Sequence, residues 1–257
     1  IVTIHGIDWQ RSKWGGFATK FLKFGEKTAA KYADEVIVLS QNVKDYFLKT
    51  YNRETVFIPN GISPAQVISP EIIKEKYNIE KNGYILFLGR LVPEKGIHYL
   101  IEAYNKINTD KVLVIAGGSS HTSEYESQLK EMAKSNSNII FTGFVEGKEL
   151  AELYSNAYIY CLPSDLEGMP ISLLEAMSFG NCCLTSDICE CTEVCKNNAE
   201  YFEKSNVENL KDKLQYLLDS DDIVNNYKNN ASDYILNKYN WDKVTKQTLD
   251  LYSKREI

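Results

Sequence analysis

Residues 167–175 are Glu167-Gly168-Met169-Pro170-Ile171-Ser172-Leu173-Leu174-Glu175, and an apolar run at 157–162 precedes them. The run is long enough for a buried parallel strand. Pro170 suits the first turn of a helix, where its missing N–H costs nothing, and apolar residues at helical spacing follow it. The stretch therefore predicts a strand, a loop that holds Glu167, and a helix that holds Glu175, with Glu175 leaning back toward the helix N-terminus.

The N-terminus of such a helix suits a phosphate, because free backbone N–H groups and the helix dipole point at the same place. Glu167 and Glu175 flank that place with seven residues between them. Their carboxylates can accept hydrogen bonds from hydroxyl groups. A ligand with both phosphates and many hydroxyl groups is a nucleotide sugar, and we expect one here.

The composition is that of a globular protein, and the net charge limits the kinds of partner that it can bind. The 257 residues suffice for one large or two ordinary domains, with 44% hydrophobic and 25% charged residues. A net charge of −6 argues against a nucleic-acid partner, which would need a basic excess. No apolar run reaches the roughly 18 residues of a membrane span, and we expect a cytoplasmic protein. The chain opens without Met, at what looks like the second half of a domain, so we also expect a fragment.

Five of the six cysteines crowd into residues 182–195. The run Cys189-Glu190-Cys191-Thr192-Glu193-Val194-Cys195 raises zinc as an alternative. Its spacing matches none of the usual zinc pairs, and no histidine lies nearby in the sequence. We therefore expect reduced thiols and no metal.

Strands and helices alternate along the chain, which predicts parallel, doubly wound sheets. Residues 63–82 differ in character, with two prolines and little β-branching, and mark a domain boundary. The predicted fold is an α/β chain of two Rossmann-like domains, the N-terminal one incomplete. The predicted parts are residues 1–62 of the first domain, a linker at 63–83, a nucleotide-sugar-binding domain at 84–238 and a terminal helix at 239–257 that crosses back. Within them we expect strands at 1–4, 35–40, 55–58, 84–88, 112–116, 138–141, 157–162 and 182–185, and helices at 17–32, 71–77, 96–107, 124–134, 148–155 and, broken near 221–222, from 207 onward.

The first expected strand ends at His5-Gly6, so His5 should stand at the tip of the sheet, where ligands of open α/β sheets bind. A loop histidine bonded to the backbone is the alternative. Residues 8–16 follow, with two indoles, two cations and two glycines. Such a loop can stack on sugars and hold anions, or it can be a solvated cap on the sheet.

The segment Gly89-Arg90-Leu91-Val92-Pro93-Glu94-Lys95-Gly96 lies between the first strand and the first helix of the second domain. Arg90 offers a planar fork for two phosphate oxygens, and Lys95 offers a point charge for a third. A surface pair in which Lys95 neutralises Glu94 is the alternative. The segment is neither a Walker A loop nor GxGxxG, which argues against P-loop chemistry and hydride transfer.

Taken together, these residues resemble the retaining glycosyltransferases of family 4, which have two Rossmann-like domains (GT-B type). The likeness follows the chain in order and covers nearly all of it. The matching segments are His5-Gly6, Ile58-Pro59-Asn60-Gly61, Gly89–Gly96, Gly117-Gly118, Gly143-Phe144, Glu167 to Glu175 with Ala176-Met177, and Tyr239-Asn240-Trp241. The opening His5–Trp14 is similar to a bacterial subgroup that includes rhamnosyltransferases of cell-surface polysaccharides.

The resemblance implies a role for each matching residue. Arg90 and Lys95 would hold the donor diphosphate and stabilise it as the leaving group. Glu175 would bind the ribose hydroxyls, Glu167 would bind the transferred sugar, and His5 would reach the reaction centre. The backbone at Gly143, Phe144 and Val145 would meet the base, and the amides of Gly168 and Met169 would meet the distal phosphate. The donor would be a UDP or dTDP sugar, with no cofactor or metal required.

The sequence departs from the family at two places. Asn181-Cys182-Cys183 replaces a Gly-rich segment that contains proline, and the family's first half-domain, with most acceptor contacts, is absent. A nucleotide-sugar epimerase and a donor-binding subunit that is inactive without the missing half therefore remain alternatives. The expected acceptor is a saccharide or a lipid-linked saccharide. Lys20, Lys23, Lys27 and Lys31 form a stripe that could rest on anionic lipid at the membrane face, although a solvated face is favoured.

Overall fold

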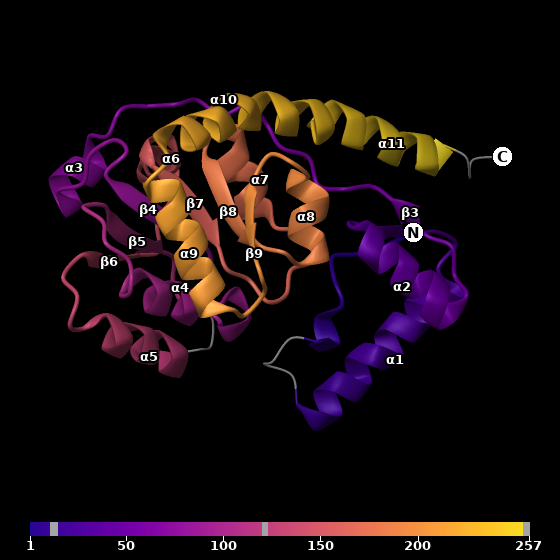
Figure 1. Ribbon diagram of the computed structural model, residues 1–257. Coiled ribbons are helices and arrows are strands. Elements are labelled where there is room, and N and C mark those ends of the chain that lie inside the picture. The colour runs from indigo at the N-terminus through magenta and orange to yellow at the C-terminus, as the bar shows by residue number, and fades with distance from the viewer. Residues whose placement is uncertain (11–14, 120–122, 254–257) are drawn as a thin grey trace.

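The computed structural model describes residues 1–10, 15–119 and 123–253 (Figure 1). In these residues the strands form two parallel sheets. The smaller sheet has the order β1-β2-β3 and consists of β1 (Val2–Ile4), β2 (Val36–Val38) and β3 (Val56–Phe57). The larger sheet has the order β6-β5-β4-β7-β8-β9. Its strands are β4 (Tyr84–Leu88), β5 (Val112–Ala116), β6 (Ile139–Gly143), β7 (Ile159–Leu162), β8 (Cys182–Ser186) and β9 (Glu200–Phe202). The predicted α/β class with parallel, Rossmann-like sheets is confirmed.

Helices connect the strands in both lobes. The first lobe has η1 (Asp8–Gln10), α1 (Gly16–Tyr32) and α2 (Gln41–Tyr51). The second has α3 (Ile72–Tyr77), η2 (Pro93–Lys95), α4 (Ile97–Tyr104), α5 (Ser123–Ala133), α6 (Gly147–Asn156), α7 (Ile171–Ser178), α8 (Cys189–Cys195), α9 (Val207–Leu218) and α10 (Asp221–Lys238), and α11 (Trp241–Ser253) follows. No helix in the described residues combines the length and the apolar character needed to cross a bilayer.

The larger sheet is buried on both faces, as its apolar strands predict. Ile85 and Leu86 of β4 and Ile159 and Tyr160 of β7 are fully buried between helices. The order of this sheet reverses between β4 and β7, since β5 and β6 lie on one side and β8 and β9 on the other. Ligands of open α/β sheets bind at such a reversal, beside the carboxyl ends of the strands.

Most of the cysteines belong to this core. Of the six, all of which lie in the described residues, five are buried and Cys189 is exposed. Burial raises the pKa of Cys182 to about 12, so its thiol stays protonated, a form that binds metals poorly. Among the described residues no three His, Cys, Asp or Glu are grouped to hold a metal ion.

The structure differs from the predicted elements near the cysteines. The run Cys189–Cys195, for which no helix was predicted, is helix α8, and its residues Cys191, Val194 and Cys195 are buried at helical spacing. Cysteine behaves here as a small apolar residue. Strand β9 was not predicted, because its three residues are too short to show a period. The break predicted near 221–222 is confirmed, since α9 ends at Leu218 and α10 begins at Asp221.

Helices α11 and α8 are two of the elements that connect the lobes. Val244 and Leu251 of α11 pack against Ile37 and Ile58 of the first lobe (Figure 1). At the other contact, the backbone N–H of Gln41 donates to Glu193 of α8 over 2.8 Å. The Asn42 amide donates to Glu190 of α8 over 2.9 Å. These contacts join the first lobe to the second.

Candidate functional site

An ion pair lies where the larger sheet reverses. Lys95 ends the turn after β4, and Glu167 lies in the loop after β7. Lys95 Nζ is 2.6 Å from Glu167 Oε1, and the two side chains are only 12% and 8% exposed. Ser164 Oγ donates to the same carboxylate oxygen over 2.6 Å. Lys95 is therefore paired with Glu167 in a largely dry setting, where a charge pair is screened far less than at the surface.

Gly96 brings the two loops into contact. Its φ of +65° lies in the left-handed region, and a Cβ there would be 2.0 Å from the Pro163 carbonyl oxygen. In addition, the backbone N–H of Asp165 donates to the carbonyl of Glu94 over 2.8 Å. The loop after β4 thus rests directly on the loop after β7, which keeps Lys95 beside Glu167.

We expect Gly96→Ala to lower the free energy of unfolding by about 2–5 kcal/mol, because left-handed strain and backbone overlap add. Gly143→Ala is the matched control. Gly143 has a φ of +73°, but nothing lies within 4 Å of its would-be Cβ. Strain alone should cost the control about 1–2 kcal/mol. Urea unfolding of both variants measures the difference, and equal losses would show that the contact with Pro163 does not stabilise the fold.

A cavity of about 430 Å³ opens beside the loop after β4. It is lined by Leu88, Gly89, Arg90, Gly117, Gly118, Ser119, Phe144 and Val145. A Cβ on Gly89 would lie 3.9 Å from Lys95 Cε, so the lysine stem passes beside the cavity wall. The carbonyl of Gly143 accepts a hydrogen bond from Gly117 N–H over 2.8 Å, which holds one of the glycines that line the cavity. Apolar and glycine walls with one arginine suit a flat ring that is joined to an anion.

Glu175 lies on α7 and is held by a tyrosine. Tyr154 OH donates to Glu175 Oε2 over 2.9 Å, and the Tyr154 ring stacks on Phe179 at 5.3 Å between centroids. Burial raises the pKa of Glu175, and this hydrogen bond opposes the shift. Burial also raises the pKa of Tyr160, and the charges of Glu167 and Glu175 add to that shift. The Tyr160 hydroxyl donates to Ser172 Oγ of α7 over 2.9 Å, so β7 is tied to the helix that holds Glu175.

The first lobe reaches the site through His5 and Asn60. A Cβ on Gly168 would lie 2.0 Å from the His5 carbonyl oxygen, so the His5 backbone rests on Gly168 while its side chain is exposed. Asn60 N lies 3.1 Å from Met169 Sδ. The structure thus brings His5, Gly168 and Met169 together, beside Glu167.

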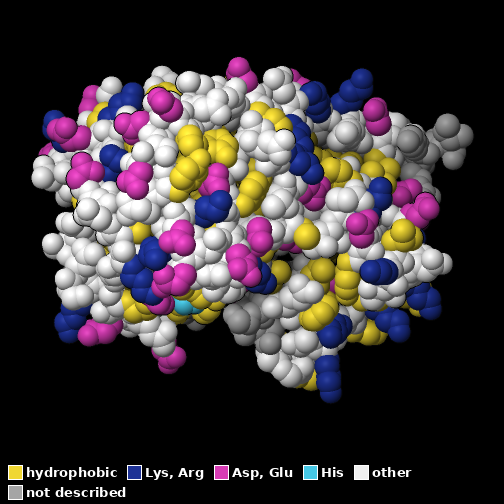
Figure 2. Space-filling model, in the orientation of Figure 1, with side chains coloured by type: hydrophobic (Ala, Val, Ile, Leu, Met, Phe, Trp, Pro, Cys, Tyr) yellow, Lys and Arg dark blue, Asp and Glu magenta, His cyan; other side chains and the backbone are white. Residues whose placement is uncertain are grey.

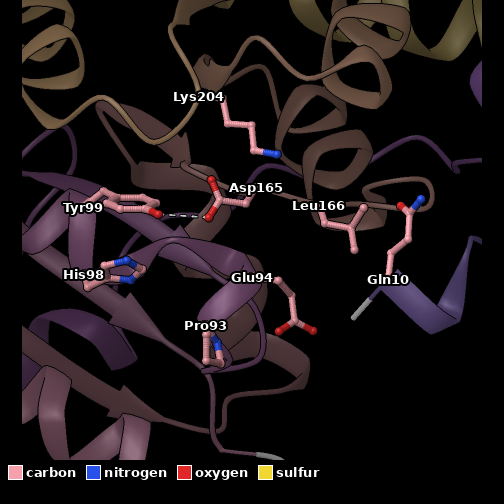
Figure 3. Close-up of a pocket in the computed structure, with 8 residues that line it drawn as sticks. All are labelled: Gln10, Pro93, Glu94, His98, Tyr99, Asp165, Leu166 and Lys204. Atoms are coloured by element: carbon pink, nitrogen blue, oxygen red, sulfur yellow. Dashed lines mark hydrogen bonds between the residues drawn. The ribbon is translucent and has the colours of Figure 1, made fainter. Parts of the chain in front are cut away.

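A second, polar cavity of about 460 Å³ flanks the ion pair and is shown in Figure 3. It is lined by Gln10, Pro93, Glu94, His98, Tyr99, Asp165, Leu166 and Lys204. Gln10 extends from η1 of the first lobe, whereas the other side chains belong to the second lobe (Figure 3). Glu94 and Leu166 precede Lys95 and Glu167 in the sequence, so the same two loops form this cavity and the ion pair.

Hydrogen bonds fix the polar groups of this second cavity. Tyr99 OH donates to Asp165 Oδ2 over 3.1 Å, and Ser205 Oγ donates to Asp165 Oδ1 over 2.7 Å. His98 Nδ1 lies 2.7 Å from Tyr125 OH. Burial lowers the pKa of His98, against the opposing charges of Asp165 and Glu102, so its ring favours the neutral form.

Several residues of both regions were not predicted as site residues. Tyr154 and Tyr160 lie in segments that their apolar neighbours mark as core, and Asp165 and Ser164 looked like loop residues that end a strand. The available signal was chemical, because a buried tyrosine hydroxyl needs a hydrogen-bond partner. Which carboxylate provides that partner depends on tertiary contacts between α6 and α7.

Comparison with protein families divides the chain into two matched segments. Residues 69–234 match the model of the glycosyl transferases group 1 family. Residues 1–63 match the model of a domain of unknown function, DUF1972. The first match covers more than half of the chain.

Curated relatives agree with this result. The chain is 30% identical to the uncharacterized glycosyltransferase MJ1607 of Methanocaldococcus jannaschii over 85% of its own length and 59% of that relative's length. It is 26% identical to the UDP-Gal:alpha-D-GlcNAc-diphosphoundecaprenol alpha-1,3-galactosyltransferase of Escherichia coli, over 97% of this chain and 67% of that protein. The chain therefore spans about three fifths to two thirds of the lengths of these relatives.

Solved structures share the fold. The Anabaena protein HepE, in complex with UDP and glucose, superposes with a TM-score of 0.87 at 17% identity, over 98% of this chain and 71% of that one. The sucrose-phosphate synthase of Thermosynechococcus elongatus superposes with a TM-score of 0.85 at 21% identity, over 98% and 67%. With the family model matched over residues 69–234, these findings show that the chain belongs to the glycosyl transferases group 1 family.

Proposed function

We propose that this chain transfers a sugar from a nucleoside-diphosphate sugar to a hydroxyl acceptor, with retention of the anomeric configuration. The observation that carries the proposal is the Lys95–Glu167 pair, which lies at the reversal of the sheet and beside two cavities. One cavity is apolar with an arginine, and the other is polar and lined from both lobes. The apolar cavity with its arginine suits the base and diphosphate of a donor, and the polar cavity suits the hydroxyl groups of an acceptor.

The donor fits the cavity around Gly89, Phe144 and Val145. Its base would lie against Val145 and Phe144, and its diphosphate would extend to Arg90 and Lys95. Glu175, fixed by Tyr154, would accept hydrogen bonds from the ribose. A uridine donor is supported by the E. coli relative that is named for UDP-Gal and by the HepE complex with UDP and glucose.

The reaction would be driven by electrostatic stabilisation. When the anomeric C–O bond breaks, the sugar becomes oxocarbenium-like and the diphosphate gains negative charge. Arg90, Lys95 and the N-terminus of α7 would stabilise that charge, and preorganised groups act most strongly where charge develops. The proposal assigns this role to the protein's own groups and not to a metal ion. The acceptor hydroxyl would enter on the face from which the phosphate leaves, while Glu167 and His5 position the sugar.

The acceptor fits the polar cavity of Gln10, Glu94 and Asp165. Carboxylate and amide oxygens accept hydrogen bonds from saccharide hydroxyls. Tyr99 and Ser205 hold Asp165 in place from two sides, which lowers the cost of ordering it on binding. We propose a saccharide or lipid-linked saccharide acceptor of cell-surface polysaccharide synthesis, in line with the E. coli relative named for a diphosphoundecaprenol substrate.

The raised pKa of Glu175 predicts how nucleotide binding depends on pH. The ribose hydroxyls need the ionised carboxylate as acceptor, so UDP affinity should fall as the pH drops through this raised pKa. The fall should begin at a higher pH than for an ordinary carboxyl group. Calorimetric titrations with UDP across the acid range measure it. The Glu175→Gln variant should bind UDP more weakly, and its UDP affinity should no longer fall as the pH drops through this range. The same fall in Glu175→Gln as in the unaltered protein would show that Glu175 does not bind the ribose.

One experiment separates transfer from the other activities that this fold could support. The full-length protein is incubated with a panel of nucleotide sugars, first alone and then with saccharide acceptors, and the release of nucleoside diphosphate is followed. We expect release that requires an acceptor, and a product with retained configuration by NMR. Rapid turnover of the sugar without acceptor would indicate an epimerase, and donor binding without any turnover would indicate a binding subunit.

A further inference from the structure

Helix α1 exposes three phenylalanines to solvent. The side chains of Phe17, Phe21 and Phe24 are 85%, 67% and 68% exposed. They are spaced by four and three residues, which places them on one stripe of the helix. Ala30 and Glu26 lie on the opposite side and are buried. An exposed aromatic stripe of this kind marks an interaction surface.

The same outer face is positively charged. Lys20, Lys23, Lys27 and Lys31 are all exposed, although the whole chain has a net charge of −6. Within this fully described helix the one acidic residue is Glu26. It is buried and accepts hydrogen bonds from Tyr46 OH over 2.7 Å and Tyr51 OH over 2.6 Å. The exposed face therefore combines phenylalanines and lysines, and it does so on an acidic protein.

We propose that α1 docks on an anionic lipid surface, with its phenylalanines in the headgroup region and its lysines on lipid phosphates. The charge selects an anionic partner, and the phenylalanines select one with an apolar interior that they can enter. Figure 2 shows hydrophobic and basic side chains together over the lobe that contains α1. Figure 1 places α1 at the edge of the molecule, away from the larger sheet.

Docking of α1 would bring the polar cavity to the lipid surface. Lys23 Nζ lies 3.9 Å from the centroid of the Trp9 ring, and Gln10, the next residue, lines that cavity. The helix that contacts lipid is thus in direct contact with the segment that forms one wall of the proposed acceptor site. The docking itself does not depend on the proposed sugar transfer, so each can fail alone.

Vesicle binding by the full-length protein tests the proposal. We expect sedimentation with vesicles of phosphatidylcholine and phosphatidylglycerol, and little with phosphatidylcholine alone. Lys20→Gln/Lys27→Gln should weaken partitioning by about fivefold per lysine, and Phe17→Ser/Phe24→Ser by about tenfold or more. Lys130→Gln/Lys134→Gln, near the end of α5 and directly after it, is the matched charge control, since both lysines are exposed in surface pairs. Leu249→Ser/Tyr252→Ser, which removes exposed apolar groups of α11, is the apolar control.

Two further measurements separate lipid from other occupants of this face. The indole fluorescence of a Phe24→Trp variant should shift to the blue on anionic vesicles and be quenched by brominated lipids. Gel filtration should show the same size for Phe17→Ser/Phe24→Ser and the unaltered protein. Failure to bind anionic vesicles, equal binding by the α1 variants, an indole signal in Phe24→Trp that brominated lipids leave unquenched, or loss of an oligomer in the phenylalanine variant would each overturn the proposal.

Discussion

Replacement of Lys95 by alanine is expected to lower turnover by about 10²–10³-fold, as for the loss of other donors aimed at a developing charge. The ammonium group is held 2.6 Å from Glu167 and beside the wall of the proposed donor cavity. On this assignment it stabilises the departing diphosphate, whose charge is larger in the transition state than in the bound donor. Steady-state kinetics with saturating acceptor measure kcat, and UDP affinity should change much less.

A control is needed because the variant also breaks a buried ion pair, which costs about 3–5 kcal/mol when one partner remains. Lys95→Met/Glu167→Gln removes both charges, so it should recover stability in thermal unfolding without recovering turnover. Lys106→Ala, which breaks exposed pairs with Glu102 and Glu208, should leave kcat unchanged. A folded Lys95→Ala protein with near-normal kcat would contradict the role assigned to this lysine.

Glu167→Ala should impair transfer more than nucleotide binding. Its carboxylate is placed by Lys95 and Ser164 at the loop before α7, where the sugar of the donor would lie. We expect kcat/KM for the donor to fall by about 10²-fold or more, while the Kd for UDP changes by less than about tenfold. Calorimetry with UDP measures the Kd, and kinetics with the intact donor measure kcat/KM, both on the same preparation.

Glu175→Ala is the matched comparison, because it removes the other carboxylate of the same loop and helix. It should show the opposite split, with a larger loss in UDP affinity. If UDP binding vanishes in Glu167→Ala and survives in Glu175→Ala, the two glutamates have been assigned in reverse. Ser164→Ala should resemble a mild Glu167 variant, since it removes one of the hydrogen bonds that orient that carboxylate.

Much of the fold could be predicted from the sequence, because buried parallel strands appear as continuous apolar runs. The runs at 84–88, 112–116 and 157–162 contain β4, β5 and β7. Helix α8 was not predicted, because three of its seven residues are cysteines, which suggested a metal site before they suggested a core. The order of the sheet, with β4 beside β7, is a tertiary property that no local pattern contains.

The candidate site was partly predictable for the same reason. Polar residues that follow an apolar strand lie at its tip, so Arg90, Lys95 and Glu167 could be assigned to one edge of the sheet. Their partners could not be assigned, because the contact of Lys95 with Glu167 spans 72 positions. Alternation of strand and helix also gives no sign of the polar cavity, whose wall is shared by Gln10 of one lobe and Asp165 of the other.

The passage of the chain between the lobes has a mechanical consequence. Ile62 N donates to the Tyr239 carbonyl over 2.6 Å, and Ile62 and Asn240 form a parallel bridge. A Cβ on Gly61 would lie 2.5 Å from Trp241 Cδ2. The segment that leaves the first lobe, at 61–62, and the segment that returns to it, at 239–241, are therefore joined to each other at one place. We expect a relative rotation of the two lobes to turn about this place, where Gly61 lies against the Trp241 indole.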